Sequence, residues 1–130
     1  MYGAIVDTNI LIRVITKDDS LRAQQATDLL GKYQTGQIAL ETAVFYETTF
    51  ILTSKKHYAM PKNVAADALR ALLATGLFAC DEELLLVVLE LYVSTNLDFV
   101  DCLVAAHVRL RRAKTLLTLD KRLLAKLNTP

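Results

Sequence analysis

Short apolar segments alternate along this chain with longer segments in which apolar residues recur every three or four positions. The short segments predict buried strands, over residues 2–6, 37–40, 77–80 and 114–119. The longer segments predict helices, over about 10–15, 21–33, 42–54, 61–74, 82–94, 98–113 and 121–127.

The alternation of strands and helices predicts the fold class. Strands joined through helices pair in parallel, and such a sheet is covered by helices on both faces. We therefore expect an α/β fold of three layers, α/β/α, around a short parallel sheet of about four strands. No internal repeat, low-complexity segment or linker interrupts the sequence, so residues 1–130 are expected to form a single domain.

Composition and charge exclude several classes of protein. Fifteen basic and fourteen acidic residues nearly cancel, which argues against a domain that binds nucleic acid through overall positive charge. The cysteines, Cys80 and Cys102, form no C-x-x-C pair, so neither a disulfide scaffold nor a zinc cluster is expected. The N-terminus does not resemble a signal peptide, and residues 84–93 are too short an apolar run to cross a membrane. We expect a cytoplasmic protein with no membrane contact.

Four carboxylates are expected at one edge of the sheet. Asp7 follows the first predicted strand and Asp120 follows the fourth, whereas Glu47 and Asp101 lie near the starts of helices. In a parallel sheet, strand carboxyl ends and the amino ends of the connecting helices share an edge, where ligands bind. The four side chains are therefore predicted to converge on one rim.

A cluster of carboxylates at this rim predicts a divalent cation. Like charges about 4 Å apart repel by about 4 kcal/mol at an effective dielectric near 20, so the cluster needs compensation. Oxygen ligands favour Mg²⁺ or Mn²⁺, and such an ion supports attack of water on a phosphodiester. Asn9 and Thr118 offer neutral oxygens beside the cluster. Glu47 is further marked by its apolar helix neighbours, among which an unpaired carboxylate is costly.

A purely structural explanation also exists for each aspartate. Asp7 and Asp120 are suited to capping the helices that follow them. Asp98 is a suitable N-cap for the next helix, with Asp101 as its partner at the third helical position. These alternatives stay open on the sequence alone.

Four motifs in order resemble those of the PIN-domain nucleases, and most closely the VapC-type toxins of toxin–antitoxin pairs. The motifs are Ile5–Leu11, Val44–Thr49, Leu97–Ala106 and Leu117–Lys121. The resemblance implies a Mg²⁺- or Mn²⁺-dependent endoribonuclease that forms a homodimer and is neutralised by a small protein antitoxin. It implies Asp7, Glu47, Asp101 and Asp120 as metal ligands and catalytic residues, with Asp98 at a position that is often acidic. Members commonly have a further strand after the last helix, whereas this sequence ends at residues 127–130, so that strand is either absent or lies beyond this sequence.

Two other functions are compatible with parts of the sequence. A phosphatase of the haloacid-dehalogenase type also has a nucleophilic aspartate after its first strand, but it requires a second aspartate where Asn9 stands. A PIN-like module without catalytic activity is the other alternative, although no member of the acidic set is missing.

Overall fold

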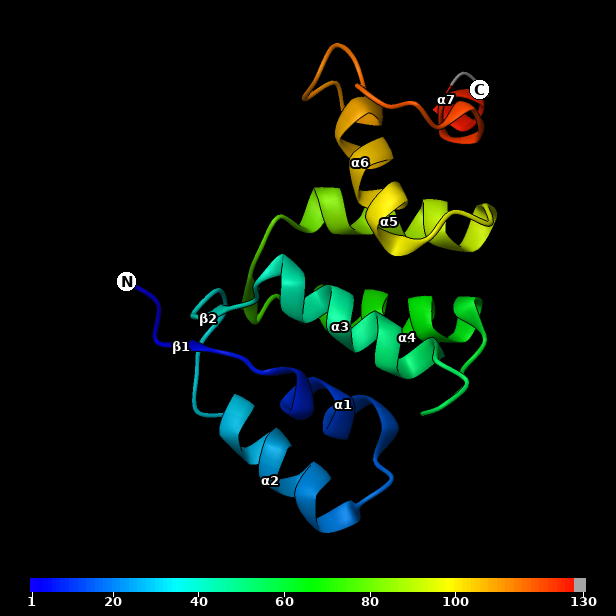
Figure 1. Cartoon of the computed structure of the whole chain (residues 1–130). Helices are drawn as coiled ribbons and strands as arrows, with labels where there is room; N and C mark the ends of the chain where they lie inside the picture. The colour runs from blue at the N-terminus through cyan, green and yellow to red at the C-terminus, as the bar shows by residue number, and fades with distance from the viewer. Residues whose placement is uncertain (128–130) are drawn as a thin grey trace. The chain divides into compact units, whose positions relative to one another are not determined.

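The computed structural model describes residues 1–127, and the last three residues of the predicted single domain lie outside that range. The chain forms two compact units, Met1–Cys80 and a second unit that begins at Asp81 (Figure 1).

The first unit contains a parallel sheet and its connecting helices. Strand β2 lies between β1 and β3, and Ile38 in β2 is in register with Ala4 on one side and Phe78 on the other. The elements in chain order are β1 (Ala4–Ile5), α1 (Thr8–Thr16), α2 (Ser20–Leu30), β2 (Ile38–Ala39), α3 (Thr42–Thr53), α4 (Lys62–Ala74) and β3 (Phe78–Ala79). The predicted α/β class with a parallel sheet is confirmed.

Helix packing gives the first unit its core. Helix α1 packs against both α2 and α3, and α3 packs against α4. Leu11, Phe45, Leu52 and Leu69 from three of these helices are fully buried. Because burying one such side chain contributes about 1.5–3 kcal/mol, these contacts hold α1 firmly and fix the position of its first turn.

The second unit is helical in the part that the structure describes. It consists of α5 (Glu82–Ser94), α6 (Phe99–Arg109) and α7 (Lys121–Leu127), with α6 packed against both other helices. Tyr92 and Phe99 meet edge to face with ring centroids 6.4 Å apart, which ties the end of α5 to the start of α6. The start of α6, where the candidate ligands lie, is thereby held in place.

The predicted strand over residues 114–119 is wrong, so the described sheet has three strands instead of about four. A strand needs a partner that completes its hydrogen bonds, and local apolar content supplies none. No described residue pairs with this segment as a strand, and Leu117 and Leu119 are 91% and 100% exposed. The preceding helix also ends earlier than predicted, at Arg109, because Arg111 adopts a left-handed φ of 58°.

None of the helices within residues 1–127 is both long enough and apolar enough to cross a membrane.

Candidate active site

Asp7 lies where β1 leads into α1, as predicted. Its backbone is extended, and Oδ1 accepts a hydrogen bond of 2.8 Å from the Thr8 amide, so Asp7 is the N-cap of α1. The buried neighbour Val6 anchors the turn, whereas the Asp7 and Asn9 side chains are exposed. Capping occupies only Oδ1 of Asp7, and Oδ2 stays available to a ligand. The capping role of Asp7 is therefore compatible with a role as a ligand.

Thr8 provides an independent sign that this turn is unusual. Its Oγ1 is buried and has no hydrogen-bond partner among the described residues. A buried hydroxyl without a partner costs about 1–3 kcal/mol, and such groups in native proteins are commonly explained by a function or a bound water or ion. This feature could not be predicted from the sequence, because a threonine after an N-cap is ordinary.

Glu47 is exposed on α3, which corrects the expectation that its apolar neighbours enclose it. Tyr46 and Phe50 on the same side are 41% and 53% exposed, and the buried side carries Phe45 and Leu52 instead. Apolar residues occur on every side of α3, so periodicity did not select the buried face. Its two buried threonines are accommodated there because their hydroxyls donate to the backbone oxygens of Val44 and Phe45, at 2.8 and 2.9 Å.

The second unit brings Asp98 and Asp101 together at the start of α6. The Asp101 amide donates to Asp98 Oδ1 at 2.8 Å, which confirms the predicted N-cap. The Asp98 side chain is exposed and that of Asp101 is half-buried. One oxygen of Asp98 is therefore committed to the backbone, while the Asp101 carboxylate projects from the first turn.

Asp120 occupies the corresponding position at the start of α7. Its Oδ1 accepts from the amides of Arg122 and Leu123, at 2.9 and 3.1 Å. The Asp120 amide in turn donates to Thr118 Oγ1 at 3.0 Å. Thr118 therefore holds the backbone of Asp120, which is a positioning role compatible with the auxiliary one expected from the sequence.

The carboxylates of the second unit influence one another. The pKa of Asp101 is raised, first because the carboxyl is partly withdrawn from water and then because Asp98 and Asp120 place negative charge near it. The Arg122 guanidinium opposes this rise in the pKa without cancelling it. Helices α6 and α7 therefore bring acidic groups from distant sequence positions into one electrostatic neighbourhood.

The donor set fits a hard divalent cation, although neither unit forms a complete site by itself. Within each unit, the described residues include no group of three or more His, Cys, Asp or Glu side chains placed to hold a metal ion. Asp7 and Glu47 belong to the first unit and Asp98, Asp101 and Asp120 to the second, so their convergence on one rim stays a prediction. The candidate ligands offer only carboxylate oxygens, which are the donors that Mg²⁺ and Mn²⁺ prefer.

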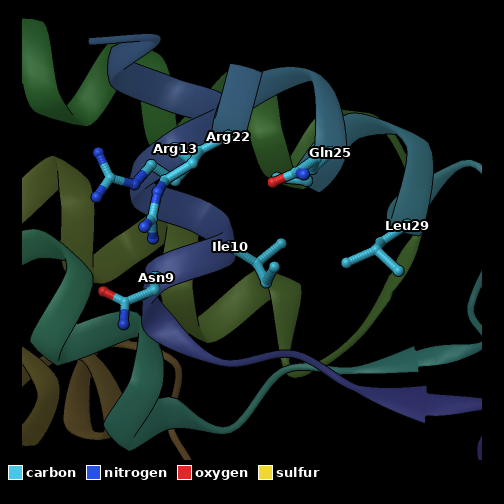
Figure 2. Close-up of a pocket in the computed structure, with 7 residues that line it drawn as sticks. Asn9, Ile10, Arg13, Arg22, Gln25 and Leu29 are labelled. Atoms are coloured by element: carbon cyan, nitrogen blue, oxygen red, sulfur yellow. The ribbon is translucent and has the colours of Figure 1, made fainter. Parts of the chain in front are cut away.

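Sequence reasoning missed two arginines that lie near Asn9. Arg13 on α1 and Arg22 on α2 line a hollow together with Asn9 (Figure 2). A spacing of four residues places Asn9 and Arg13 on one face of α1, which was a usable signal. Nothing in the sequence placed Arg22 beside them, because that contact depends on how α2 packs against α1.

The comparisons identify the family. The PIN domain description matches residues 4–128, nearly the whole chain and parts of both units. The chain belongs to the PIN domain family. Membership indicates a nuclease-type function and speaks against the haloacid-dehalogenase alternative. Neither the comparison with curated proteins nor that with solved structures found a significant match.

Proposed function

We propose that this protein is a metal-dependent endoribonuclease that cleaves RNA phosphodiesters. The observation that carries the proposal is the gathering of carboxylates at helix starts, in a chain of a nuclease-type family. Asp7 begins α1, and Asp98, Asp101 and Asp120 begin α6 and α7. Carboxylates at these places are favoured by the positive ends of the helices, and they have oxygens to spare for a cation.

We propose Asp7, Glu47, Asp101 and Asp120 as the ligands of Mg²⁺ or Mn²⁺ and as the catalytic set. When bound, such an ion lowers the pKa of water and offsets negative charge that develops on the phosphate. The protein contributes by fixing its carboxylates. Capping bonds hold Asp7 and Asp120, and the exposed Glu47 meets the ion without first losing a protein partner.

Asp98, Asn9 and Thr118 have auxiliary roles in this proposal. Asp98 orients Asp101 through the cap of α6, and Thr118 orients Asp120 through its backbone amide. Asn9, exposed in the first turn of α1, offers an amide that both donates and accepts hydrogen bonds near Asp7. Rigid support of this kind determines how accurately ligands are held.

We further propose that the protein is the toxin of a toxin–antitoxin pair, acts in the cytoplasm as a homodimer, and forms a single domain over residues 1–130. The resemblance to VapC-type toxins supports the toxin role and a small protein antitoxin as partner. Exposed apolar side chains on α3 and α5, such as Phe50 at 53% and Val93 at 39%, support association with another chain.

RNA cleavage by the full chain tests the nuclease function. A panel of single-stranded and structured RNAs is incubated with Mg²⁺, with Mn²⁺ or with EDTA, and products are resolved by size. We expect internal cleavage with either metal and none with EDTA. Glu47→Gln should lose activity, whereas the control Glu41→Gln should keep it, because Glu41 is exposed beside the same helix and makes no side-chain capping bond.

Cleavage that persists in EDTA, or in Glu47→Gln, would contradict the proposed mechanism. Absence of cleavage across the panel, together with absence of metal binding, would favour the alternative of a PIN-like binding module without catalytic activity.

A further inference from the structure

A hollow between α1 and α2 lies next to the Asp7 turn. It encloses about 230 Å³ and is lined by Asn9, Ile10 and Arg13 of α1 and by Arg22, Gln25, Ala26 and Leu29 of α2. Pockets for drug-sized ligands usually exceed about 300 Å³, so this one suits a smaller planar group. All of its walls belong to the first unit.

The lining changes character along the hollow. Figure 2 shows Arg13, Arg22 and Asn9 together at one end and Leu29 at the other, with Ile10 between them. Leu29 is 48% exposed, so the apolar end is open to solvent. Gln25 adds an amide that donates and accepts hydrogen bonds. The hollow thus offers guanidinium groups and an amide at one end and an apolar surface at the other, with a second amide from Gln25.

Acidic neighbours orient the two arginines and leave several N–H donors of each available to a ligand. Arg13 Nη1 donates to Asp18 Oδ1 at 3.1 Å, and Arg22 Nε lies 3.5 Å from Asp19 Oδ2. A guanidinium has five N–H donors, so each arginine keeps several for a ligand. The Arg22 side chain is 66% exposed, which makes its guanidinium accessible from solvent.

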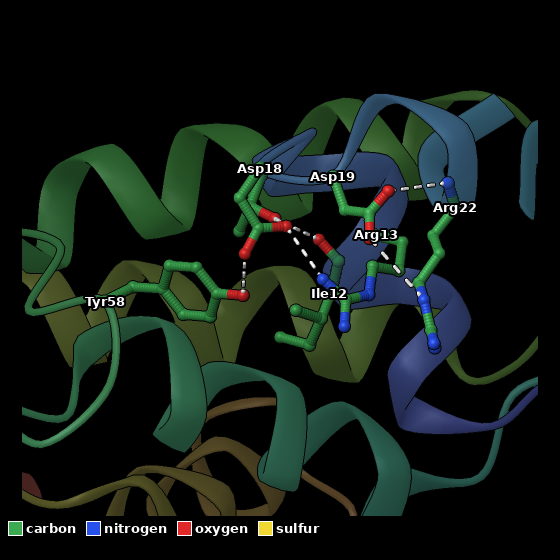
Figure 3. A network of polar contacts seen from close by, with 7 residues as sticks. Ile12, Arg13, Asp18, Asp19, Arg22 and Tyr58 are labelled. Carbon is green, nitrogen blue, oxygen red and sulfur yellow. Dashed lines mark hydrogen bonds and ion pairs between the residues drawn. The ribbon is translucent and has the colours of Figure 1, made fainter.

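Asp18 is itself held from another direction (Figure 3). Tyr58 Oη donates to Asp18 Oδ2 at 2.7 Å, and the Thr16 hydroxyl shares its one proton between the Ile12 oxygen at 2.8 Å and Asp18 Oδ1 at 3.0 Å. The negative charge of Asp18 is therefore shared among three donors. Arg13 is positioned by this network, and an incoming anion competes with only one of the bonds that Asp18 accepts.

We propose that this hollow binds one nucleotide of a single-stranded RNA, immediately next to the phosphodiester to be cleaved. Arg13 and Arg22 hold a phosphate at the end near Asn9, the base lies on Ile10 and Leu29, and Gln25 contacts the edge of the base. Arginine forks match phosphate geometry, and amide side chains read base edges in unstacked RNA. This assignment rests on the proposed ribonuclease function, because it is the nearness of Asp7 to Asn9 that connects the hollow to cleavage.

Equilibrium RNA binding in EDTA tests the assignment without catalysis. The full chain is titrated into a fluorescently labelled single-stranded RNA of ten nucleotides, and anisotropy is measured over a range of salt concentrations. Arg22→Gln should weaken affinity about tenfold, because a hydrogen bond to a charged phosphate is lost. Its salt dependence should also become shallower by about 0.7, the value for one phosphate contact on a single strand.

Arg70→Gln is the matched control. Arg70 on α4 also pairs with an aspartate three residues earlier, Asp67 at 3.0 Å, and does not line the hollow. We expect its RNA affinity to equal that of the wild type. Gln25→Ala should keep the wild-type salt dependence while altering the preference among labelled A, C and U homopolymers, because it removes a base contact and no phosphate contact.

The outcomes separate this inference from the proposed function. If the wild type cleaves RNA and Arg22→Gln binds RNA as tightly as the wild type does, the nucleotide site is overturned and the nuclease function stands. Loss of affinity in Arg22→Gln with no cleavage by the wild type would support nucleotide binding in the hollow, and it would overturn the nuclease function and the placement beside a cleaved phosphodiester. Equal loss in Arg22→Gln and Arg70→Gln would also overturn the site, because binding would then follow overall charge.

Discussion

Asp98 and Asp101 lie three residues apart at the start of α6 and have different roles. Asp98 Oδ1 accepts the Asp101 amide as the cap of α6, whereas the half-buried Asp101 carboxyl has a raised pKa, first from partial burial and then from its acidic neighbours. We expect Asp98→Asn to leave metal affinity within a few-fold, because asparagine caps a helix about as well. Asp101→Asn should lose metal binding and RNA cleavage.

Asp98→Ala is the stability control for this pair, and it should lower the free energy of unfolding by about 1 kcal/mol through loss of the cap. Metal titration and urea unfolding of the three variants check these expectations. If Asp98→Asn reduces metal affinity more than Asp101→Asn does, the two roles have been assigned the wrong way round.

Asp81 gives a pH-dependent contribution to stability. Its pKa is lowered from 3.8, first by the hydrogen bond from Arg112 and against the opposing effect of desolvation, with the Leu84 amide as a further donor. A lowered folded-state pKa means that the stabilisation is present above 3.8 and is lost as pH falls through the folded-state pKa. Both side chains are partly exposed, so water screens the charges and the contribution of the pair to stability is small.

Arg112→Gln should therefore be less stable than the wild type at neutral pH, and the difference should shrink as the pH falls toward about 2. Urea unfolding at both pH values measures it. A difference that is the same at both would show that Asp81 and Arg112 do not interact through charge.

At the scale of elements, helices were predicted well because their boundaries carry local chemical signals. Asp81 caps α5, and the predicted range of 82–94 agrees with the observed Glu82–Ser94. Residues 114–119 were predicted wrongly, because a strand depends on a partner that the segment itself does not encode. For α3, the buried face was not predictable, since apolar residues surround the whole helix.

The turns that precede β2 and β3 depend on glycine. Gly36 and Gly76 both have φ of 73°, and the Gly36 amide donates to the Gly76 oxygen at 2.9 Å. A Cβ on Gly36 would meet nothing within 4 Å, so Gly36→Ala tests the backbone conformation alone. It should cost about 1–2 kcal/mol, because an alanine disfavours the left-handed region.

Gly31→Ala is the control for this variant. Gly31 ends α2 with φ of −65°, which any residue adopts, and an added Cβ would make only an ordinary contact of 3.4 Å with the Thr27 oxygen. Thermal unfolding should show Gly31→Ala at or above wild-type stability. Equal losses in the two variants would mean that the positive φ is not what Gly36 provides.

At the scale of the whole molecule, exposed apolar side chains predict self-association. Tyr46 and Phe50 on α3 are 41% and 53% exposed. We expect light scattering at micromolar concentration to show a dimer, the commonest soluble oligomer. Phe50→Glu should weaken it, whereas Val64→Glu on α4, at a position 45% exposed, should not. A wild-type monomer would contradict the expectation.

The sequence predicts the residues of the candidate site and also their convergence on one rim, and that convergence stays a prediction. The sequence predicted Asp7 after the first strand and Asp98 as an N-cap because these are local features, and the structure agrees. Asp120 was predicted to follow a fourth strand that the described residues do not form, and it instead accepts first-turn amides of α7, as the structural alternative predicted. The arginines of the hollow were missed because Arg13 and Arg22 come together only through the packing of α1 on α2. Whether carboxylates of both units share one ion depends on long-range contacts that no local pattern specifies.

Calorimetric titration of Mn²⁺ into the full chain tests that central claim most directly. The variants are Asp7→Asn from the first unit and Asp101→Asn from the second, and asparagine preserves the cap that Asp7 provides. The control is Asp28→Asn on α2, which removes the same charge from an exposed residue bonded to Gln24. We predict that the wild type and the control bind Mn²⁺ alike and that each ligand variant loses at least about tenfold in affinity. Wild-type affinity in either ligand variant would contradict the account.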